Sequence, residues 1–127
     1  MESDEHRYEH DELTERAIGC AFVVSNSLGH GFLEKVYENA LAIELRHMGH
    51  EVQQRAPVEV RYREEIVGIY QPDLLVGRSV VLELKCVAAL DRTHRAQCLN
   101  YLRATGLKTG LVINFGRPRL DVQRILA

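Results

Sequence analysis

The sequence has 127 residues, of which 46% are hydrophobic and 27% are charged, and this predicts one globular domain with a single core. No apolar run approaches the roughly 20 residues that a membrane span needs, and the acidic start leads us to expect no signal peptide. The three cysteines, Cys20, Cys86 and Cys98, lie far apart and cannot all pair. We therefore expect reduced thiols and a cytoplasmic protein rather than a disulfide-stabilised secreted one.

The formal net charge of −2 hides an uneven distribution of charge along the chain. Residues 1–15 hold seven acidic residues and one arginine, whereas residues 91–127 hold seven basic residues and two acidic ones. A basic stretch of this kind fits a nucleic-acid partner, and it fits scattered surface charge equally well. We expect residues 1–11 to form a flexible acidic tail and residues 12–127 to form a single domain.

The first part of the chain has helical periodicity. Apolar residues recur at the spacing of one helix face from Leu13 to Leu28, and a second helix is predicted from Phe32 to Met48. The segment 25–31 contains two glycines and predicts a break between the two helices.

Beyond residue 50 the hydrophobic period changes to two, which is typical of strands. In chain order we predict strands over 52–55, 58–62, 66–76 and 79–86, a helix over 90–104 that ends at Gly106, and strands over 110–115 and 120–126. Pro72 interrupts the third of these strands because proline cannot donate a ladder hydrogen bond. The order predicts an α/β sandwich with a mixed sheet.

A glutamate and a lysine lie on one face of a strand that is otherwise hydrophobic. Glu83 and Lys85 share that face because side chains alternate along a strand. If the preceding hairpin closes with the three-residue loop 77–79, Asp73 lies opposite Glu83, with Cβ atoms about 4.5–5.5 Å apart. Two carboxylates this close repel each other unless a cation lies between them, and oxygen ligands favour Mg²⁺ or Mn²⁺. A two-residue loop would spoil this geometry, and a plain ion pair of Lys85 with either carboxylate is the structural alternative.

Two helices supply further candidates. Glu34 lies in the first turn of the second helix, where a carboxylate either favours the helix dipole or serves as a third acidic ligand. Gln97 and Tyr101 lie one turn apart on the last helix, as part of an amphipathic surface or of a site. His94, three residues before Gln97, faces the cleft or belongs to the polar helix surface, and we favour the surface. Basic residues that either contact phosphates or form a solvated face are Arg92, Arg95, Arg103 and Lys108.

Together these residues carry a family resemblance over about residues 12–125. Pro72-Asp73 followed by Glu83-Leu84-Lys85 resembles the PD-(D/E)XK pattern of the restriction-endonuclease-like nuclease superfamily. Gln97-x-x-x-Tyr101 is similar to the QxxxY helix motif of RecB-type members. Gly31-x-x-Glu34-x-x-Tyr37, with Asn114-Phe-Gly116 further on, resembles the family of GxxExxY (GxxExxR-type) proteins.

The resemblance implies a fold and a role for each candidate residue. The implied fold is a restriction-endonuclease-like core (αβββαβ), with a mixed four-stranded central sheet flanked by helices and an extra N-terminal helix. A divalent ion, Mg²⁺ or Mn²⁺, would be bound by Asp73, Glu83 and the backbone carbonyl of Leu84. Glu34 would be a further ligand or position the water, and Lys85 would orient or activate that water. Gln97 and Tyr101 would hold Lys85 or contact the substrate backbone.

The function implied by the resemblance is a metal-dependent nuclease that hydrolyses phosphodiester bonds, in DNA rather than RNA, during DNA repair, recombination or defence. The alternative is a non-catalytic module on the same fold that binds nucleic acid or a protein partner. Because a core of 127 residues leaves little surface for target selection, we expect a second copy of the chain or a partner protein to supply it.

Overall fold

The structure is a computed structural model that describes the backbone of residues 2–127 and the side chains of residues 12–127. The first helix, α1, spans Glu2–Leu28. The predicted flexible tail over residues 1–11 lies outside the described side chains and stays a prediction. No helix in the described part of the chain is both long enough and apolar enough to cross a membrane.

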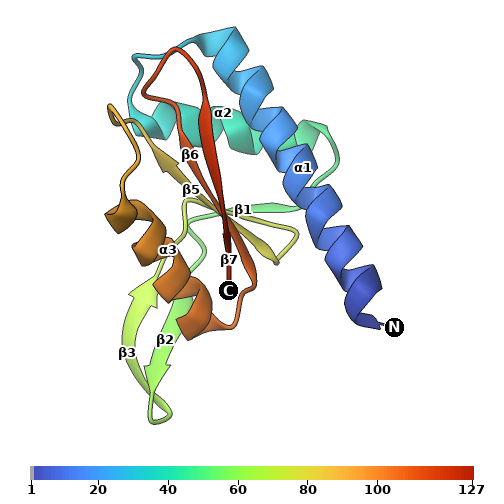
Figure 1. The fold of residues 1–127 in the computed structure, drawn as a ribbon, viewed down its shortest axis with the longest axis vertical. Coiled ribbons are helices and arrows are strands. Elements are labelled where there is room, and N and C mark those ends of the chain that lie inside the picture. The colour runs from blue at the N-terminus through green and yellow to red at the C-terminus, as the bar shows by residue number, and fades with distance from the viewer. Residues whose placement is uncertain (1) are drawn as a thin grey trace.

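Five strands form one mixed sheet in the order β1-β4-β5-β6-β7 (Figure 1). They are β1 (Val52–Gln54), β4 (Leu74–Val76), β5 (Val80–Lys85), β6 (Thr109–Asn114) and β7 (Asp121–Leu126). Only β5 and β6 pair in parallel, and all other neighbouring strands of this sheet are antiparallel. The helix α3 (Arg92–Thr105) makes the crossover between them, so β5 lies at the centre of the sheet and leads directly into α3.

The two faces of the sheet carry different helices. The helices α1 and α2 (Glu34–His47) pack on one face, where Leu82 and Leu84 of β5 join the larger hydrophobic core. The helix α3 packs on the other face, where Val81 of β5 joins a smaller core with Cys98 and Leu102. This division follows from the alternation of side chains along β5.

The predicted fold class, an α/β fold with a mixed sheet flanked by helices, is confirmed, with five strands in the central sheet where four were expected. The prediction of a single strand over residues 66–76 was wrong. Its first part is β3 (Glu65–Tyr70), which pairs with β2 (Val58–Tyr62) in a separate hairpin, and its second part is β4. The break falls around Pro72, whose missing N–H cannot continue a ladder.

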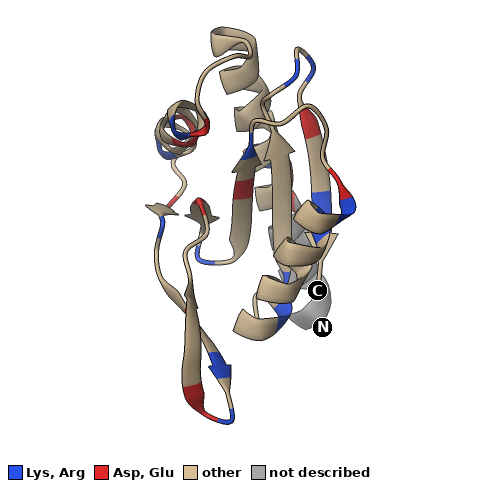
Figure 2. Ribbon diagram, turned by 90° about the vertical axis from the view of Figure 1, so that its left-hand side faces the viewer, with Lys and Arg blue, Asp and Glu red and all other residues tan. Residues whose placement is uncertain are grey.

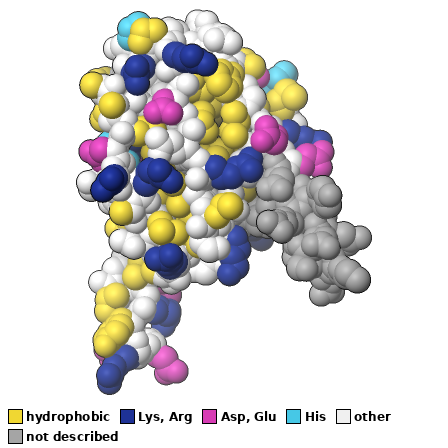
Figure 3. Space-filling model, in the orientation of Figure 1, with side chains coloured by type: hydrophobic (Ala, Val, Ile, Leu, Met, Phe, Trp, Pro, Cys, Tyr) yellow, Lys and Arg dark blue, Asp and Glu magenta, His cyan; other side chains and the backbone are white. Residues whose placement is uncertain are grey.

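The β2–β3 hairpin, residues 58–70, projects from the body as an arm (Figures 1 and 2). At its tip Arg63 and Glu64 have positive φ values of 49° and 68°, the sign that a tight two-residue hairpin turn requires. Hydrophobic side chains lie exposed along the arm (Figure 3), namely Tyr62, Ile66, Val67 and Ile69. Within the arm, β2 contacts α3, so the root of the arm lies against the smaller core.

Candidate active site

The hairpin between β4 and β5 has the predicted three-residue loop. Val76 pairs with Val80 and Leu74 pairs with Leu82, so the same register places Asp73 opposite Glu83. Gly77 and Arg78 both have φ of 58° in this loop. The predicted loop length is therefore confirmed, while the position of Asp73 opposite Glu83 lies one residue beyond the last ladder pair.

One cavity of about 290 Å³ brings together all six residues predicted to be catalytic. They come from three places in the fold, the β4–β5 hairpin, the start of α2 and the middle of α3, and are Glu34, Asp73, Glu83, Lys85, Gln97 and Tyr101. The remaining lining residues are Arg55, Ile69, Tyr70, Gln71, His94 and Cys98. Their convergence is a structural fact, whereas their catalytic role stays a prediction.

Asp73 is buried and held by the backbone of the next strand. Its Oδ2 accepts a hydrogen bond from the N–H of Leu84 at 2.8 Å, and its Oδ1 lies 4.0 Å from Nη1 of Arg55. Burial raises the pKa of Asp73 above its usual range, although the Leu84 N–H and the charges of Arg55 and Lys85 oppose the rise. The Asp73 carboxyl is thus a desolvated group with few partners, which is the usual condition of a functional carboxylate.

The backbone of β5 also presents an oxygen to the cavity side. The N–H and carbonyl of one strand residue point toward the same neighbouring strand, and these directions alternate along the strand. The carbonyl of Lys85 accepts from the N–H of Phe115, which follows β6. The N–H of Leu84 points the other way, toward Asp73, and the carbonyl of Leu84 therefore also points toward Asp73.

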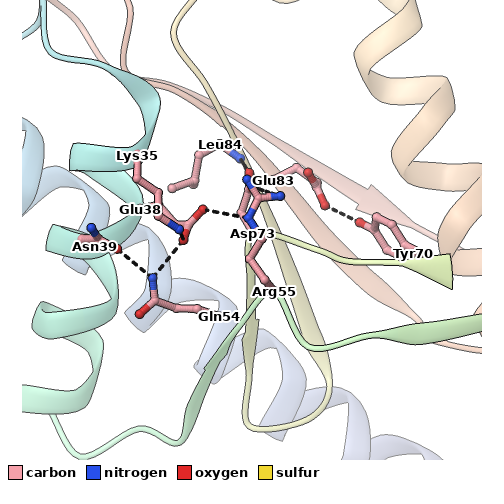
Figure 4. A network of polar contacts seen from close by, with 9 residues as sticks. All are labelled: Lys35, Glu38, Asn39, Gln54, Arg55, Tyr70, Asp73, Glu83 and Leu84. Carbon is pink, nitrogen blue, oxygen red and sulfur yellow. Dashed lines mark hydrogen bonds and ion pairs between the residues drawn. The ribbon is translucent and has the colours of Figure 1, made fainter.

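Glu83 is half-buried beside α3. Burial raises the pKa of Glu83 to about 7, while a hydrogen bond donated by the hydroxyl of Tyr70 and the charge of Lys85 favour the ionised form. The charge of Asp73 raises the pKa of Glu83 further. Figure 4 shows the Glu83 side chain extended toward Tyr70.

The two glutamates of α2 have separate surroundings. Glu34 lines the cavity, and burial followed by the charge of Asp73 raises its pKa. Glu38 is buried and satisfied, since it accepts from Lys35 at 2.6 Å and from Gln54 at 2.9 Å. Its Oε1 also lies 3.7 Å from Nε of Arg55, which extends between Glu38 and Asp73 (Figure 4). Glu38 therefore holds Arg55 at the edge of the cavity.

The donor set suits a hard divalent cation, because it consists of carboxylate oxygens from Glu34, Asp73 and Glu83 and the carbonyl of Leu84. Within residues 12–127, no three His, Cys, Asp or Glu side chains converge closely enough to hold a metal ion between them. The oxygen donors thus fit such an ion in type.

Two residues of the sequence pattern fix the chain just after Lys85. Asn114 is buried, its Oδ1 accepts from the N–H groups of Val87 at 3.0 Å and Gly116 at 2.9 Å, and its Nδ2 donates to the carbonyl of Val87. At Gly116 a Cβ atom would lie 2.5 Å from the backbone nitrogen of Val87, so only glycine allows this approach. Asn114 and Gly116 therefore position the loop that leaves β5.

Tyr37 fixes the chain just before Glu34. Its hydroxyl donates to the carbonyl of Gly29 at 2.6 Å and accepts from the N–H of Phe32 at 3.3 Å. Its buried ring stacks on Phe115, with ring centroids 4.6 Å apart. In the Gly31-x-x-Glu34-x-x-Tyr37 segment, the tyrosine thus anchors the turn that leads into α2.

Sequence reasoning missed Arg55 and Tyr70 and misplaced His94. Arg55 and Tyr70 follow ordinary strand patterns, and only the folded arrangement brings them to Asp73 and Glu83. His94 lines the cavity rather than the outer helix surface. The Nδ1 of His94 accepts a hydrogen bond from the N–H of Asp91, and Oδ1 of Asp91 accepts one from the N–H of His94, so the two residues form a capping box at the start of α3. The signal for this cap in the sequence is an aspartate just before the helix.

The predicted phosphate-contacting residues lie elsewhere. Arg92 and Arg95 line a second hollow, together with Arg124 between α3 and β7. Arg103 and Lys108 are exposed, and none of the four is among the described residues that line the acidic cavity. Contact of these basic side chains with nucleic acid therefore stays a prediction.

Comparisons with known proteins agree with this geometry. Residues 11–125 match the family model of the PD-(D/E)XK nuclease superfamily. An alkaline exonuclease from Laribacter hongkongensis has a similar fold, with a TM-score of 0.53 and 18% identity over 72% of this chain and 55% of that one. The protein SSO0001 has a TM-score of 0.55 and 20% identity over 94% of this chain and 60% of the other. This chain thus spans less than two thirds of either structure, and no curated protein matches the sequence.

Proposed function

We propose a function from one premise, that the chain belongs to the PD-(D/E)XK nuclease superfamily. The function is metal-dependent hydrolysis of phosphodiester bonds, in DNA rather than RNA, in a process such as DNA repair, recombination or defence. The observation that carries the proposal is that Asp73 and Glu83 line one cavity, on the side of the sheet opposite the larger apolar core, where the β4–β5 register continued by one residue sets them opposite each other. Lys85 lies on the same face of β5 and lines the same cavity.

Nucleases of this superfamily generally use divalent metal ions. In this chain Asp73, Glu83 and the carbonyl of Leu84 would hold the ion, Mg²⁺ or Mn²⁺, and Glu34 would bind it or position the water. When bound, such an ion lowers the pKa of a coordinated water and stabilises charge on the phosphate.

The other cavity residues act on water and on substrate. Lys85 orients the attacking water and offsets the negative charge that builds up on the phosphate, because its ammonium lies beside Glu83 on the same face. Gln97 and Tyr101 hold Lys85 or contact the substrate backbone from α3. Outside the cavity, phosphates of the bound strand contact the basic residues Arg92, Arg95, Arg103 and Lys108.

The proposal also includes the subfamily, the helix motif, the domain and the location of the protein. The segment from Gly31 to Tyr37 supports membership of the GxxExxY group, and the positions of Gln97 and Tyr101 in the cavity support the RecB-type QxxxY motif. We further propose that residues 12–127 form one catalytic domain in the cytoplasm. Target selection would come from a second copy of the chain or from a partner protein.

A second candidate function is a non-catalytic module that binds nucleic acid or a partner. One observation favours it, namely that no three acidic, histidine or cysteine side chains within residues 12–127 converge on a metal position. Such a module would bind through its basic residues in a salt-dependent way, without turnover and without a need for metal.

A cleavage assay tests the proposed function. End-labelled single-stranded, duplex and branched DNA, and RNA of the same sequence, are incubated with the protein and Mg²⁺ or Mn²⁺, with a chelator as the blank. We expect metal-dependent cleavage that falls about 10²–10³-fold in Asp73→Ala and Lys85→Ala. The control is Glu51→Ala, an exposed acidic residue paired with Arg78 away from the cavity. Absence of cleavage of every substrate, or cleavage untouched by both substitutions, refutes the nuclease, and metal-independent binding that survives Asp73→Ala supports the module.

A further inference from the structure

Tyr70 contacts two residues of the proposed site, although no motif contains it. It is the last residue of β3, at the root of the arm, and its side chain is buried. Its hydroxyl donates a hydrogen bond to Oε1 of Glu83, and its ring lies parallel to that of Tyr101, with centroids 3.9 Å apart and an interplanar angle of 4°. Tyr70 thus joins β3, β5 and α3 at one side of the cavity.

The stack on Tyr101 fixes where the Tyr70 hydroxyl lies. A ring that is buried and packed face to face on a second ring cannot swing without losing that contact. The hydrogen bond therefore starts from a fixed donor, and it selects the Glu83 rotamer whose carboxylate reaches that donor (Figure 4). The orientation of Glu83 is consequently restrained by a residue of another sheet, together with the backbone N–H of Asp73, which also donates to this carboxylate.

Groups from four elements surround the Glu83 carboxyl. The groups that face this carboxyl are Tyr70 from β3, Asp73 next to β4, Lys85 from β5 and Cys98 from α3. Burial and the charge of Glu83 raise the pKa of the Cys98 thiol to about 12, so the thiol carries no charge at neutral pH. Two donors reach the Glu83 carboxylate, namely the Tyr70 hydroxyl at Oε1 and the backbone N–H of Asp73.

We propose that Tyr70 is a positioning residue for metal binding, which orients Glu83 through Oε1 so that the Glu83 carboxylate can bind the divalent ion together with Asp73. The proposal rests on the proposed function, since it assumes that Glu83 and Asp73 are the metal ligands. Hydrogen-bond partners that orient metal ligands are worth about 10–100-fold in metal affinity. Loss of the hydroxyl would therefore weaken binding of the ion even though Tyr70 never touches it.

The test is calorimetric titration of the full chain with Mn²⁺ in the absence of nucleic acid. Tyr70→Phe removes the hydroxyl and keeps the stacked ring, and we expect its Kd for Mn²⁺ to rise about 10–100-fold. The matched control is Tyr62→Phe, the same chemical change at an exposed tyrosine of the arm, which should leave the Kd unchanged. Circular dichroism and thermal unfolding establish that each variant is folded before it is titrated.

A double-substitution cycle separates positioning from a general structural effect. In a Glu83→Gln background the carboxylate is gone, so adding Tyr70→Phe should change the Kd by less than about twofold. A full effect of Tyr70→Phe in that background would show that Tyr70 acts through something other than Glu83, and would overturn the proposal. An unchanged Kd in the Tyr70→Phe single variant would also overturn the proposal. A lower Kd would overturn it as well, because it would show that the hydrogen bond from Tyr70 competes with the ion for Glu83.

The variant Asp73→Ala distinguishes failure of this proposal from failure of the proposed function. If Asp73→Ala abolishes Mn²⁺ binding and Tyr70→Phe has no effect, the metal site stands and the role of Tyr70 is refuted. If the wild-type protein binds no Mn²⁺, or Asp73→Ala binds it as tightly as the wild-type protein does, the metal site itself is refuted, and the role of Tyr70 falls with it.

Discussion

The two faces of β5 differ sharply, because one is apolar and buried and the other is polar and lines the cavity. On the face toward α1 and α2, Leu82 and Leu84 are completely buried in the larger core. On the face toward α3, Glu83 and Lys85 are only half-buried and line a polar cavity. Because the side-chain period of a strand is two, consecutive residues serve opposite purposes without disturbing one another. One strand thus contributes stability on one side and the proposed chemistry on the other.

The cavity exists because the smaller core covers only part of its face. Val81, at the start of β5, packs with Cys98 and Leu102 of α3, whereas the last residues of the strand face the cavity instead. Sites at the carboxyl ends of strands are common in open α/β sheets, since the chain leaves the sheet there and frees space. In this chain Asn114 and Gly116 hold the departing loop, which keeps the space open next to Lys85.

The largest expected effect is on activity and comes from the polar face. Lys85→Met keeps most of the side-chain volume and removes the ammonium, so the rate of DNA cleavage should fall about 10²–10³-fold. The free energy of unfolding should change by less than about 1 kcal/mol, because a half-buried charge contributes little net stability. Cleavage rates and urea unfolding of the same preparation measure both quantities. A loss of stability as large as the loss of activity would mean that Lys85 is structural.

The largest expected effect on stability comes from the residue next to it. Leu84→Ala leaves a void in the larger core and should lower the free energy of unfolding by about 2–5 kcal/mol. Leu126→Ala is the matched control, because Leu126 is 64% exposed and should change stability by less than about 0.5 kcal/mol. Equal effects of the two substitutions in urea unfolding would contradict the division of β5 into a core face and a cavity face.

A smaller effect is expected on the pH dependence of stability. The pKa of Glu83 is raised from 4.5 to about 7 in the folded protein, so the folded state binds more protons than the unfolded state between these values. The contribution of Glu83 is therefore fully present below about pH 4.5 and is lost as the pH rises through 7, by up to about 3 kcal/mol. Glu83→Gln should remove this loss in metal-free urea unfolding between pH 5 and 8. An unchanged pH profile in Glu83→Gln would contradict the raised pKa.

The smallest expected effect concerns the loop that leaves β5. Gly116→Ala forces a methyl group against the backbone of Val87 and should cost about 1–3 kcal/mol of stability. Gly68→Ala in the arm is the control, because nothing lies within 4 Å of its added Cβ, and it should be nearly neutral. Urea unfolding compares the two variants. If both are neutral, the close approach of Gly116 to Val87 does not restrain the loop.

Local patterns predicted the elements that the fold uses at the site. The alternation of β5 placed Glu83 and Lys85 on one face, and of the two loop lengths that the sequence left open, the structure has the three-residue loop 77–79. Pro72 marked an interruption of the run 66–76, but the assignment of its two halves to different sheets was not predictable, since both halves have strand periodicity and only packing decides which sheet each one joins.

The partners of the site residues could not be predicted either, because they are brought together only by packing between different elements. Arg55 and Tyr70 reach Asp73 and Glu83 through contacts between different elements, and nothing in their local sequence marks them. His94 was misassigned because helical periodicity alone does not say which polar face of α3 lies over the cavity. Chemistry that resides on one strand was therefore accessible from the sequence, while the residues that orient it were not.

The most direct test of the central claim, that the polar face of β5 is a metal centre, is anomalous diffraction from crystals of the protein grown with Mn²⁺. We predict a Mn²⁺ peak in the cavity, about 2 Å from oxygens of Asp73 and Glu83 and from the carbonyl oxygen of Leu84. An absence of any peak in the cavity at saturating Mn²⁺, or a peak whose ligands exclude both Asp73 and Glu83, would contradict it.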